Sequence, residues 1–265
     1  HKGEILSLLG ENGSGKTTLM NMLSGIYYPD EGQIFVDGKE VEIRSPKDAF
    51  DLHIGMIHQH FKLVDVFTAA ENIILGLPGD KGKMDKAAVS KAVREIADRY
   101  GFDIDPNQKI YEMSVSQKQT VEIVKVLYRG ADILILDEPT AVLTPQETEK
   151  LFTVMRNMKK DGKAIIIITH KLHEVLAVSD RVAVLRKGEY IGDTDTATAS
   201  QQSLTDMMVG RAVSLNIDRP LNENQTERLK VEHLTVKNKE GVKMLDDVTF
   251  TAMGGEILGI AGIAG

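Results

Sequence analysis

Residues 10–17 read GENGSGKT and match the pattern G-x-x-x-x-G-K-[ST], which is typical of a phosphate-binding loop. An apolar stretch precedes the pattern and a helix is expected to begin near Lys16, which is the context that such a loop requires. Glycines let successive backbone N–H groups point inward, the helix start adds a positive dipole end, and Lys16 supplies a cation for the outer phosphates. The alternative is a glycine-rich turn beside an ordinary surface lysine. The residues expected to bind phosphates are Gly10, Asn12, Gly13, Ser14, Gly15, Lys16, Thr17 and Thr18, with the Thr17 hydroxyl also a candidate ligand for Mg²⁺.

Two adjacent carboxylates, Asp137 and Glu138, end the apolar run 133–136. Ligands of open α/β sheets gather at the carboxyl ends of strands, and neighbouring strand residues face opposite ways. We therefore expect Asp137 to hold Mg²⁺, directly or through water, and Glu138 to act as the general base toward an attacking water. By itself such a pair is more often a solvated turn, and the phosphate-binding loop favours the chemical interpretation.

Polar side chains also follow two other apolar runs. His170 comes after the run 164–169 and could contact a γ-phosphate or its water. Gln59 follows the run 54–58, and its amide oxygen could complete the coordination shell of Mg²⁺. Taken alone, His170 would be interpreted as a capping or packing histidine, and Gln59 would indicate little.

The apolar runs alternate with helical stretches, which predicts an α/β fold with a mostly parallel sheet. A helix start is indicated at Thr144, where Pro145 and Glu147 supply the first-turn proline and the capping-box acid. A similar start at Thr68, followed by the amphipathic segment 85–100, predicts a helical subdomain over about 68–129. The predicted strands are 4–9, 54–58, 132–136 and 164–168, with two further short strands in 181–187 and 189–194.

The last third of the chain contains a partial repeat. The polar, aperiodic segment 211–228 is predicted to be a linker. Beyond it, the GEIL of residues 3–6 recurs at 255–258, and the same glycine spacing follows both copies. We therefore expect 229–265 to be the start of a second copy of the unit that occupies 1–210.

Composition excludes several classes of function. The formal net charge is −7, from 32 basic and 39 acidic side chains, so no bulk positive field attracts nucleic acid, which is not an expected partner. The absence of cysteine excludes disulfides, thiolate nucleophiles and Cys-ligated metals. No apolar run reaches the ~18–20 residues of a membrane span. The N-terminal residues also lack the pattern of a secretion signal.

The order of these motifs resembles the ATP-binding cassette (ABC) family of transport ATPases. The motifs are the phosphate loop, a Gln after a strand, Ser-x-x-Gln at a helix start, ILDEPT, and a strand ending in THK. The partial repetition at 229–265 is similar to the tandem-cassette subunits that energise sugar and nucleoside importers. The resemblance implies a P-loop NTPase core with a small antiparallel β region. It also implies that 1–210 is a first cassette lacking its N-terminal strands, and that 229–265 is the N-terminal β segment of a second cassette.

The resemblance also implies roles for individual residues. It makes Gln59 the Q-loop residue, Glu138 the base and His170 the switch histidine, with Ala141–Thr144 as the D-loop. Residues of the signature, Ser114, Ser116 and Gln117, would then contact the nucleotide held by a partner cassette. Ser116 stands where relatives carry a glycine that lets the backbone approach the γ-phosphate.

The function that the resemblance implies is ATP binding and hydrolysis to energise an importer for a simple sugar or a nucleoside, with ATP and Mg²⁺ bound. The implied location is the cytoplasmic face of the membrane. The implied partners are a second ATP-binding cassette, integral membrane permease subunits and, indirectly, an extracellular substrate-binding protein. Three alternatives are a soluble tandem cassette acting on ribosomes or DNA, a small-molecule P-loop kinase and a regulatory cassette that only binds nucleotide. The negative charge disfavours the first alternative, and the Ser-x-x-Gln motif disfavours the second.

Overall fold

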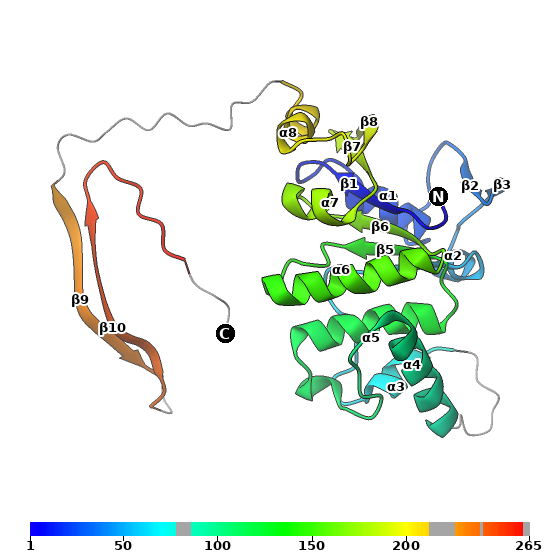
Figure 1. Cartoon of the computed structure of the whole chain (residues 1–265), viewed down its shortest axis with the longest axis horizontal. Helices are drawn as coiled ribbons and strands as arrows, with labels where there is room; N and C mark the ends of the chain where they lie inside the picture. The colour runs from blue at the N-terminus through cyan, green and yellow to red at the C-terminus, as the bar shows by residue number, and fades with distance from the viewer. Residues whose placement is uncertain (78–85, 212–225, 239–240, 262–265) are drawn as a thin grey trace. The chain divides into compact units, whose positions relative to one another are not determined.

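The computed structural model describes residues 1–77, 86–211, 226–238 and 241–261. The chain folds as two compact units, His1–Val213 and Ser214–Gly265 (Figure 1). Within the described ranges, no helix is long and apolar enough to cross a membrane.

A six-stranded sheet forms the centre of the first unit, in the order β4-β5-β6-β1-β7-β8. All neighbouring strands pair in parallel except β8, which runs antiparallel to β7. The prediction of an α/β fold with a mostly parallel sheet is therefore confirmed. The strands are β1 (Ile5–Leu9), β4 (Ile54–Ile57), β5 (Ile133–Asp137), β6 (Ala164–Ile168), β7 (Arg181–Arg186) and β8 (Glu189–Asp195).

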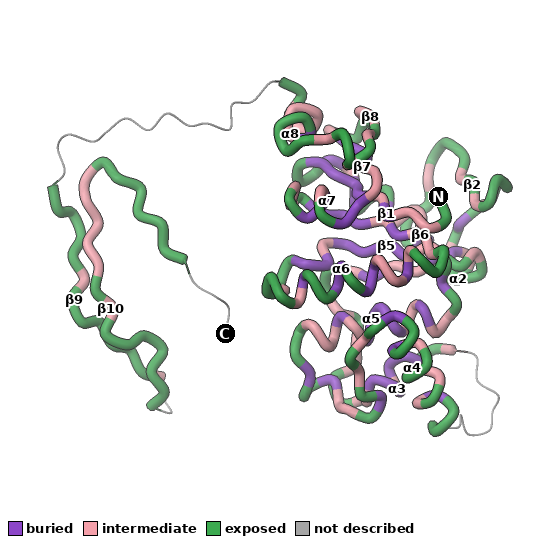
Figure 2. Tube along the Cα trace, viewed as in Figure 1, coloured by how far each residue is buried: buried purple, intermediate pink, exposed green. Residues whose placement is uncertain are grey.

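Helices cover both faces of this sheet, and its central strands β1, β5 and β6 are almost entirely apolar, as expected for strands buried on both sides (Figure 2). Leu134 and Leu136 of β5 share a buried cluster with Met155 of α6 (Pro145–Lys160). Ile135, between them, belongs instead to the cluster of Met20 on the other face. That second face is covered by α1 (Lys16–Leu23) and α2 (Pro46–Asp51).

A group of helices forms its own small core beside the sheet. Ile73, Val93, Ile110 and Val121 are all fully buried in one cluster that joins these helices. This cluster holds the helix that begins at the signature together with the other helices of the group. The elements are α3 (Ala69–Ile74), α4 (Lys86–Tyr100), the 3₁₀ turn η1 (Ile110–Glu112) and α5 (Val115–Tyr128).

Capping boxes start four of the described helices. At α3, the Thr68 hydroxyl accepts from the Glu71 N–H, and the Glu71 carboxylate accepts from the Thr68 N–H at 2.9 Å. The Thr144 box with Glu147 starts α6 in the same way, with Pro145 in the first turn. Both helix starts that the sequence predicts are therefore present.

The Glu71 cap makes folding stability depend on pH. The Thr68 backbone N–H and then the Lys86 ammonium lower the pKa of Glu71 from 4.5 to about 2. Because the folded pKa is the lower one, ionised Glu71 stabilises the fold above about pH 4.5, and this contribution is lost as the pH falls toward 2. We expect Glu71→Gln to lower the free energy of unfolding at pH 7 and to matter less at pH 3, as measured by urea titration. An equal loss at both pH values would contradict this assignment.

The remaining elements of the first unit are short. The β2–β3 pair is a separate antiparallel hairpin, and it lies in a region for which the sequence analysis predicted no strand. These elements are β2 (Ile34–Val36), β3 (Lys39–Val41), α7 (Leu172–Val178) and α8 (Gln201–Val209).

The second unit contains an antiparallel pair, β9 (Glu227–Lys237) and β10 (Lys243–Met253). Of the predicted linker 211–228, residues 212–225 lie outside the described residues, and Glu227 and Arg228 already belong to β9. The repeated GEIL at 255–258 is not a strand.

The two GEIL copies differ because only the first has strands to pair with. Ile5 lies in β1, between β6 and β7, and is completely buried. Ile257, its counterpart, is fully exposed and pairs with no strand in the described part of the chain. The glycines that continue the second copy, Gly262 and Gly265, lie outside the described residues.

Candidate functional site

Most of the predicted site residues line one cavity of about 410 Å³. They arrive from the carboxyl ends of four parallel strands, β1, β4, β5 and β6, which all meet at one edge of the sheet. The lining residues are Asn12, Gly13, Ser14, Gly15, Lys16, Thr17, Thr18, Gln59, Asp137, Glu138, Ile168 and His170. Ile168 is the one lining residue that the sequence analysis did not single out.

The glycine-rich loop takes the shape of an anion cradle. Gly13 and Gly15 have φ angles of 80° and 94°, a left-handed backbone that glycine adopts without steric cost. Gly15 is the N-cap of α1, so the unpaired N–H groups of the first helical turn face the cavity end of the loop. This arrangement suits the oxygens of a phosphate chain.

Gly10 is required for a different reason, close packing. A Cβ at this position would lie 2.3 Å from the backbone carbonyl oxygen of Leu185 on β7. The sequence analysis treated all the loop glycines as turn residues, whereas Gly10 lets the loop press against the neighbouring strand.

Lys16 lies inside the loop and is only 7% exposed. Its ammonium donates to the carbonyl oxygens of Gly10 at 2.7 Å and Glu11 at 2.9 Å. Burial lowers the pKa of Lys16, while the nearby charges of Glu138 and Asp137 act in the opposite direction. The loop thus holds a cation beside two carboxylates, ready to face an anionic ligand.

The two carboxylates line the same cavity, which differs from the expectation that they face opposite ways. Asp137 ends β5, but Glu138 has a φ of 49°, so the alternation of the strand stops between them. The Glu138 N–H still donates to Ile168 O of β6 at 2.9 Å. Nothing in the local sequence signals this left-handed residue.

The surroundings of the two acids differ. Burial, and then the charge of Glu138, raise the pKa of Asp137, and Lys16 partly opposes this shift. Glu138 Oε1 lies 2.9 Å from His170 Nδ1. Its other oxygen, Oε2, is buried and has no hydrogen-bond partner. A buried carboxylate oxygen without a partner is costly, so Oε2 of Glu138 has an unused capacity to accept a hydrogen bond.

The donor set around the cavity suits magnesium. Thr17, Gln59 and Asp137 present a hydroxyl, an amide oxygen and a carboxylate, which are hard oxygen donors. Among the described residues, no three His, Cys, Asp or Glu side chains cluster closely enough to hold a metal by themselves. This agrees with Mg²⁺, which is usually bound through one or two carboxylates and completes its shell with phosphate oxygens and water.

The signature residues lie elsewhere. Ser114, Ser116 and Gln117 line a different cavity, of about 510 Å³, between α5 and α6. Ser114 caps α5 in a reciprocal box with Gln117. The structure therefore does not bring the signature to the phosphate loop of the same unit.

Ser116 has a partner of its own in this second cavity. The pKa of Glu147 is held below its usual value by the Thr144 N–H and hydroxyl, and also by a hydrogen bond from the Ser116 hydroxyl. The Ser116 side chain thus joins the start of α5 to the cap of α6.

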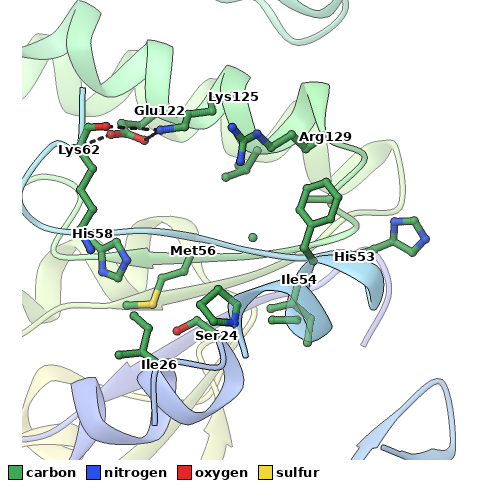
Figure 3. A pocket seen from close by; sticks show the side chains of 16 residues that line it. Ser24, Ile26, His53, Ile54, Met56, His58, Lys62, Glu122, Lys125 and Arg129 are labelled. Atoms are coloured by element: carbon green, nitrogen blue, oxygen red, sulfur yellow. Dashed lines mark hydrogen bonds and ion pairs between the residues drawn. The ribbon is translucent and has the colours of Figure 1, made fainter. Parts of the chain in front are cut away.

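A third cavity, of about 310 Å³, lies between the helical group and the sheet (Figure 3). Glu122 and Lys125 of α5, with Arg129 directly after the helix, form one side of the cavity, and Ile26 and Met56 form the apolar floor that faces them. Glu122 is paired with Lys125 and accepts from the Lys62 N–H at 2.7 Å. Arg129 donates to Leu75 O, but its buried Nε has no partner. This cavity is apolar at its floor and basic at its rim.

The glycine-rich loop between β1 and α1, with carboxylates at the end of β5, defines a P-loop NTPase. Similar solved structures support this assignment of the fold. The crystal structure of the ADP conformation of an ATP-binding cassette from an ABC transporter superposes with a TM-score of 0.67 and 25% identity, covering 78% of this chain and 85% of that one. A dimeric structure of a bacterial ABC transporter cassette gives a TM-score of 0.63 and 26% identity, covering 74% and 87%.

Residues 1–141 match the family model of the ABC transporter, and the chain belongs to this family. It is 48% identical to the nucleoside import ATP-binding protein NupA of Lactococcus lactis and 50% identical to the guanosine import ATP-binding protein NupO of Bacillus subtilis. It is 42% identical to the ribose import ATP-binding protein RbsA 1 of Streptomyces avermitilis. All three alignments cover the whole of this chain, and the chain spans about half the length of these relatives, 50–52%.

Proposed function

We propose that the chain is the ATP-binding and ATP-hydrolysing part of a subunit that energises an importer for nucleosides or simple sugars. The observation that carries the proposal is the meeting of the glycine-rich loop, Gln59, the two carboxylates and His170 on one cavity. The names of the similar proteins supply the substrate class. NupA and NupO are nucleoside and guanosine import proteins and are more similar to this chain than the ribose protein, which favours a nucleoside.

ATP would bind with its phosphates against the backbone N–H groups of residues 13–18 and its outer phosphates beside Lys16. Thr17, Gln59 and Asp137 would hold Mg²⁺, Asp137 either directly or through water. When bound, the metal supplies positive charge that offsets the phosphate oxygens.

Hydrolysis would depend on Glu138 and His170. The unpartnered Oε2 of Glu138 is free to accept a proton from an attacking water. His170, bonded to Oε1, would hold the carboxylate in orientation and contact the γ-phosphate or the water. Because Ser114, Ser116 and Gln117 lie away from this cavity, they would serve the nucleotide of a second cassette, with ATP between the two.

The third cavity would receive the membrane partner. Its apolar floor of Ile26, Phe50 and Met56 and its basic Lys125 and Arg129 suit a short amphipathic helix that carries a carboxylate. An integral membrane permease subunit would supply this helix, and the protein would then act at the cytoplasmic face of the membrane. An extracellular substrate-binding protein would deliver the substrate to the permease.

The docking proposal predicts that Ile26→Glu uncouples the protein. Ile26 is partly exposed within the cavity, so a carboxylate there should leave the fold and basal ATP turnover intact while repelling an acidic, apolar partner. We expect transport to fall by about 10-fold or more, in line with an interface charge clash of a few kcal/mol. Phe35→Glu is the matched control, since Phe35 is an exposed apolar residue outside the cavity. Equal transport by both variants would rule out docking at this site.

The proposed function as a whole is tested by uptake in cells that lack the gene. Labelled guanosine and labelled ribose are supplied to cells carrying the intact protein, the Glu138→Gln variant, or neither. Restored nucleoside uptake with the intact protein alone is the expected result. Restored ribose uptake would change the substrate class, and no restored uptake of either would contradict an import function.

A further inference from the structure

Glu138 is held in a backbone conformation that it would not adopt alone. A left-handed, non-glycine residue is strained and persists only where its surroundings fix it. The Glu138 side chain, which lines the nucleotide cavity, is therefore positioned by the residues that hold the neighbouring peptides.

Two helices hold the peptides that follow Glu138. The Gln119 side-chain amide, from α5, donates to Pro139 O at 2.6 Å and is 5% exposed. On the other side, the Lys171 ammonium donates to Thr140 O at 2.9 Å. The Thr140 hydroxyl also donates to Glu174 of α7 at 2.5 Å, where both side chains are buried.

The two attachments have different origins. Lys171 and Glu174 follow His170 in the chain. They therefore connect the peptides after Glu138 to the segment that follows the neighbouring strand β6. Gln119 instead belongs to the signature helix, two residues after Gln117 and within the helical group. A buried hydrogen bond of this kind transmits small displacements, because its loss would leave the donor or the carbonyl unsatisfied.

We infer that Gln119 is a positioning residue through which the signature helix sets the orientation of the Glu138 carboxylate in its own cassette. This inference rests on the proposed ATP hydrolysis. When α5 shifts relative to the sheet, Gln119 carries the Pro139 peptide with it, and the free oxygen of Glu138 moves relative to the phosphate loop. Hydrolysis then depends on how the helical group is placed as well as on which residues line the nucleotide cavity.

The test compares Gln119→Met, which keeps the size and removes the amide donor, with wild type in the intact protein. We expect kcat for ATP to fall about 10–100-fold, the scale of a misplaced catalytic group, while KM changes less than about 3-fold. Thr153→Val is the matched control. Gln119 and Thr153 both line the cavity of about 510 Å³ that contains the signature residues. The Thr153 hydroxyl bonds only within α6, to Glu149 O, so wild-type kinetics are expected for its variant.

A combined variant separates positioning from simple damage. In a Glu138→Gln background, adding Gln119→Met should cost almost nothing further, because both changes act on the same carboxylate. ATP binding should stay at the wild-type level and the variant should remain fully folded at the assay temperature. Gln119→Glu, which also lacks the donor, serves if the Met variant does not fold. Unchanged kcat, a raised KM alone, or a loss of kcat that tracks a loss of stability would each overturn the inference. Absence of turnover in wild type would instead overturn the proposed function, and the inference with it.

Discussion

ATP turnover in Glu138→Gln is expected to fall by about 10²–10⁴-fold, the usual contribution of a positioned general base. The substitution keeps the shape of the side chain and a polar oxygen for His170, but an amide does not accept a proton from water. Since the phosphate loop is unchanged, ATP should still bind. The structure supports this separation, because Lys16 contacts the loop carbonyls and Glu138 contacts His170.

Single-turnover hydrolysis and equilibrium ATP binding measure the two effects separately. Glu149→Gln, the same change on the exposed face of α6, is the control and should behave as wild type. If the Glu138→Gln variant hydrolysed ATP at the wild-type rate, another residue would have to be the general base. Loss of binding together with turnover would place Glu138 in ground-state binding instead.

The second large effect is expected for Lys16→Ala, which should weaken ATP binding by about 10–100-fold. A hydrogen bond from a charged group contributes about 1.5–3 kcal/mol, and 1.4 kcal/mol corresponds to a factor of ten. The loss also leaves Asp137 and Glu138 without the cation that offsets them near the phosphates. The Gly10 and Glu11 carbonyls lose their donor as well.

Titration calorimetry with ATP in the presence of Mg²⁺ measures this change directly. Lys47→Ala removes an exposed lysine of α2 and should leave the affinity unaltered. An unchanged affinity in the Lys16 variant would mean that the triphosphate does not lie in the loop.

Local patterns in the sequence predicted those parts of the fold and the site that depend on residues close together in the chain. The loop around Lys16, the capping boxes of Thr68 and Thr144, and the buried strands each involve residues a few positions apart. Parallel pairing then brings the strand ends together, so the meeting of Gln59 and His170 at one edge also followed from the pattern.

Other features depend on residues far apart in the chain. Glu138 is left-handed and its N–H bonds to Ile168 O of β6, and the amide of Gln119 reaches Pro139, 20 positions away. The close approach of Gly10 to β7 is likewise tertiary. The repeated GEIL shows that one local sequence can form two structures. Its first copy, at 3–6, leads into the buried strand β1, and its second copy, at 255–258, is an exposed segment. Strand formation there depends on pairing partners rather than on the local sequence.

The most direct measurement is a structure of the intact Glu138→Gln protein with ATP and Mn²⁺, whose anomalous scattering locates the metal. The account predicts the phosphates against the N–H groups of residues 13–18 and the metal between the Thr17 hydroxyl and Asp137. A nucleotide bound elsewhere, with the metal away from both of these side chains, would contradict it.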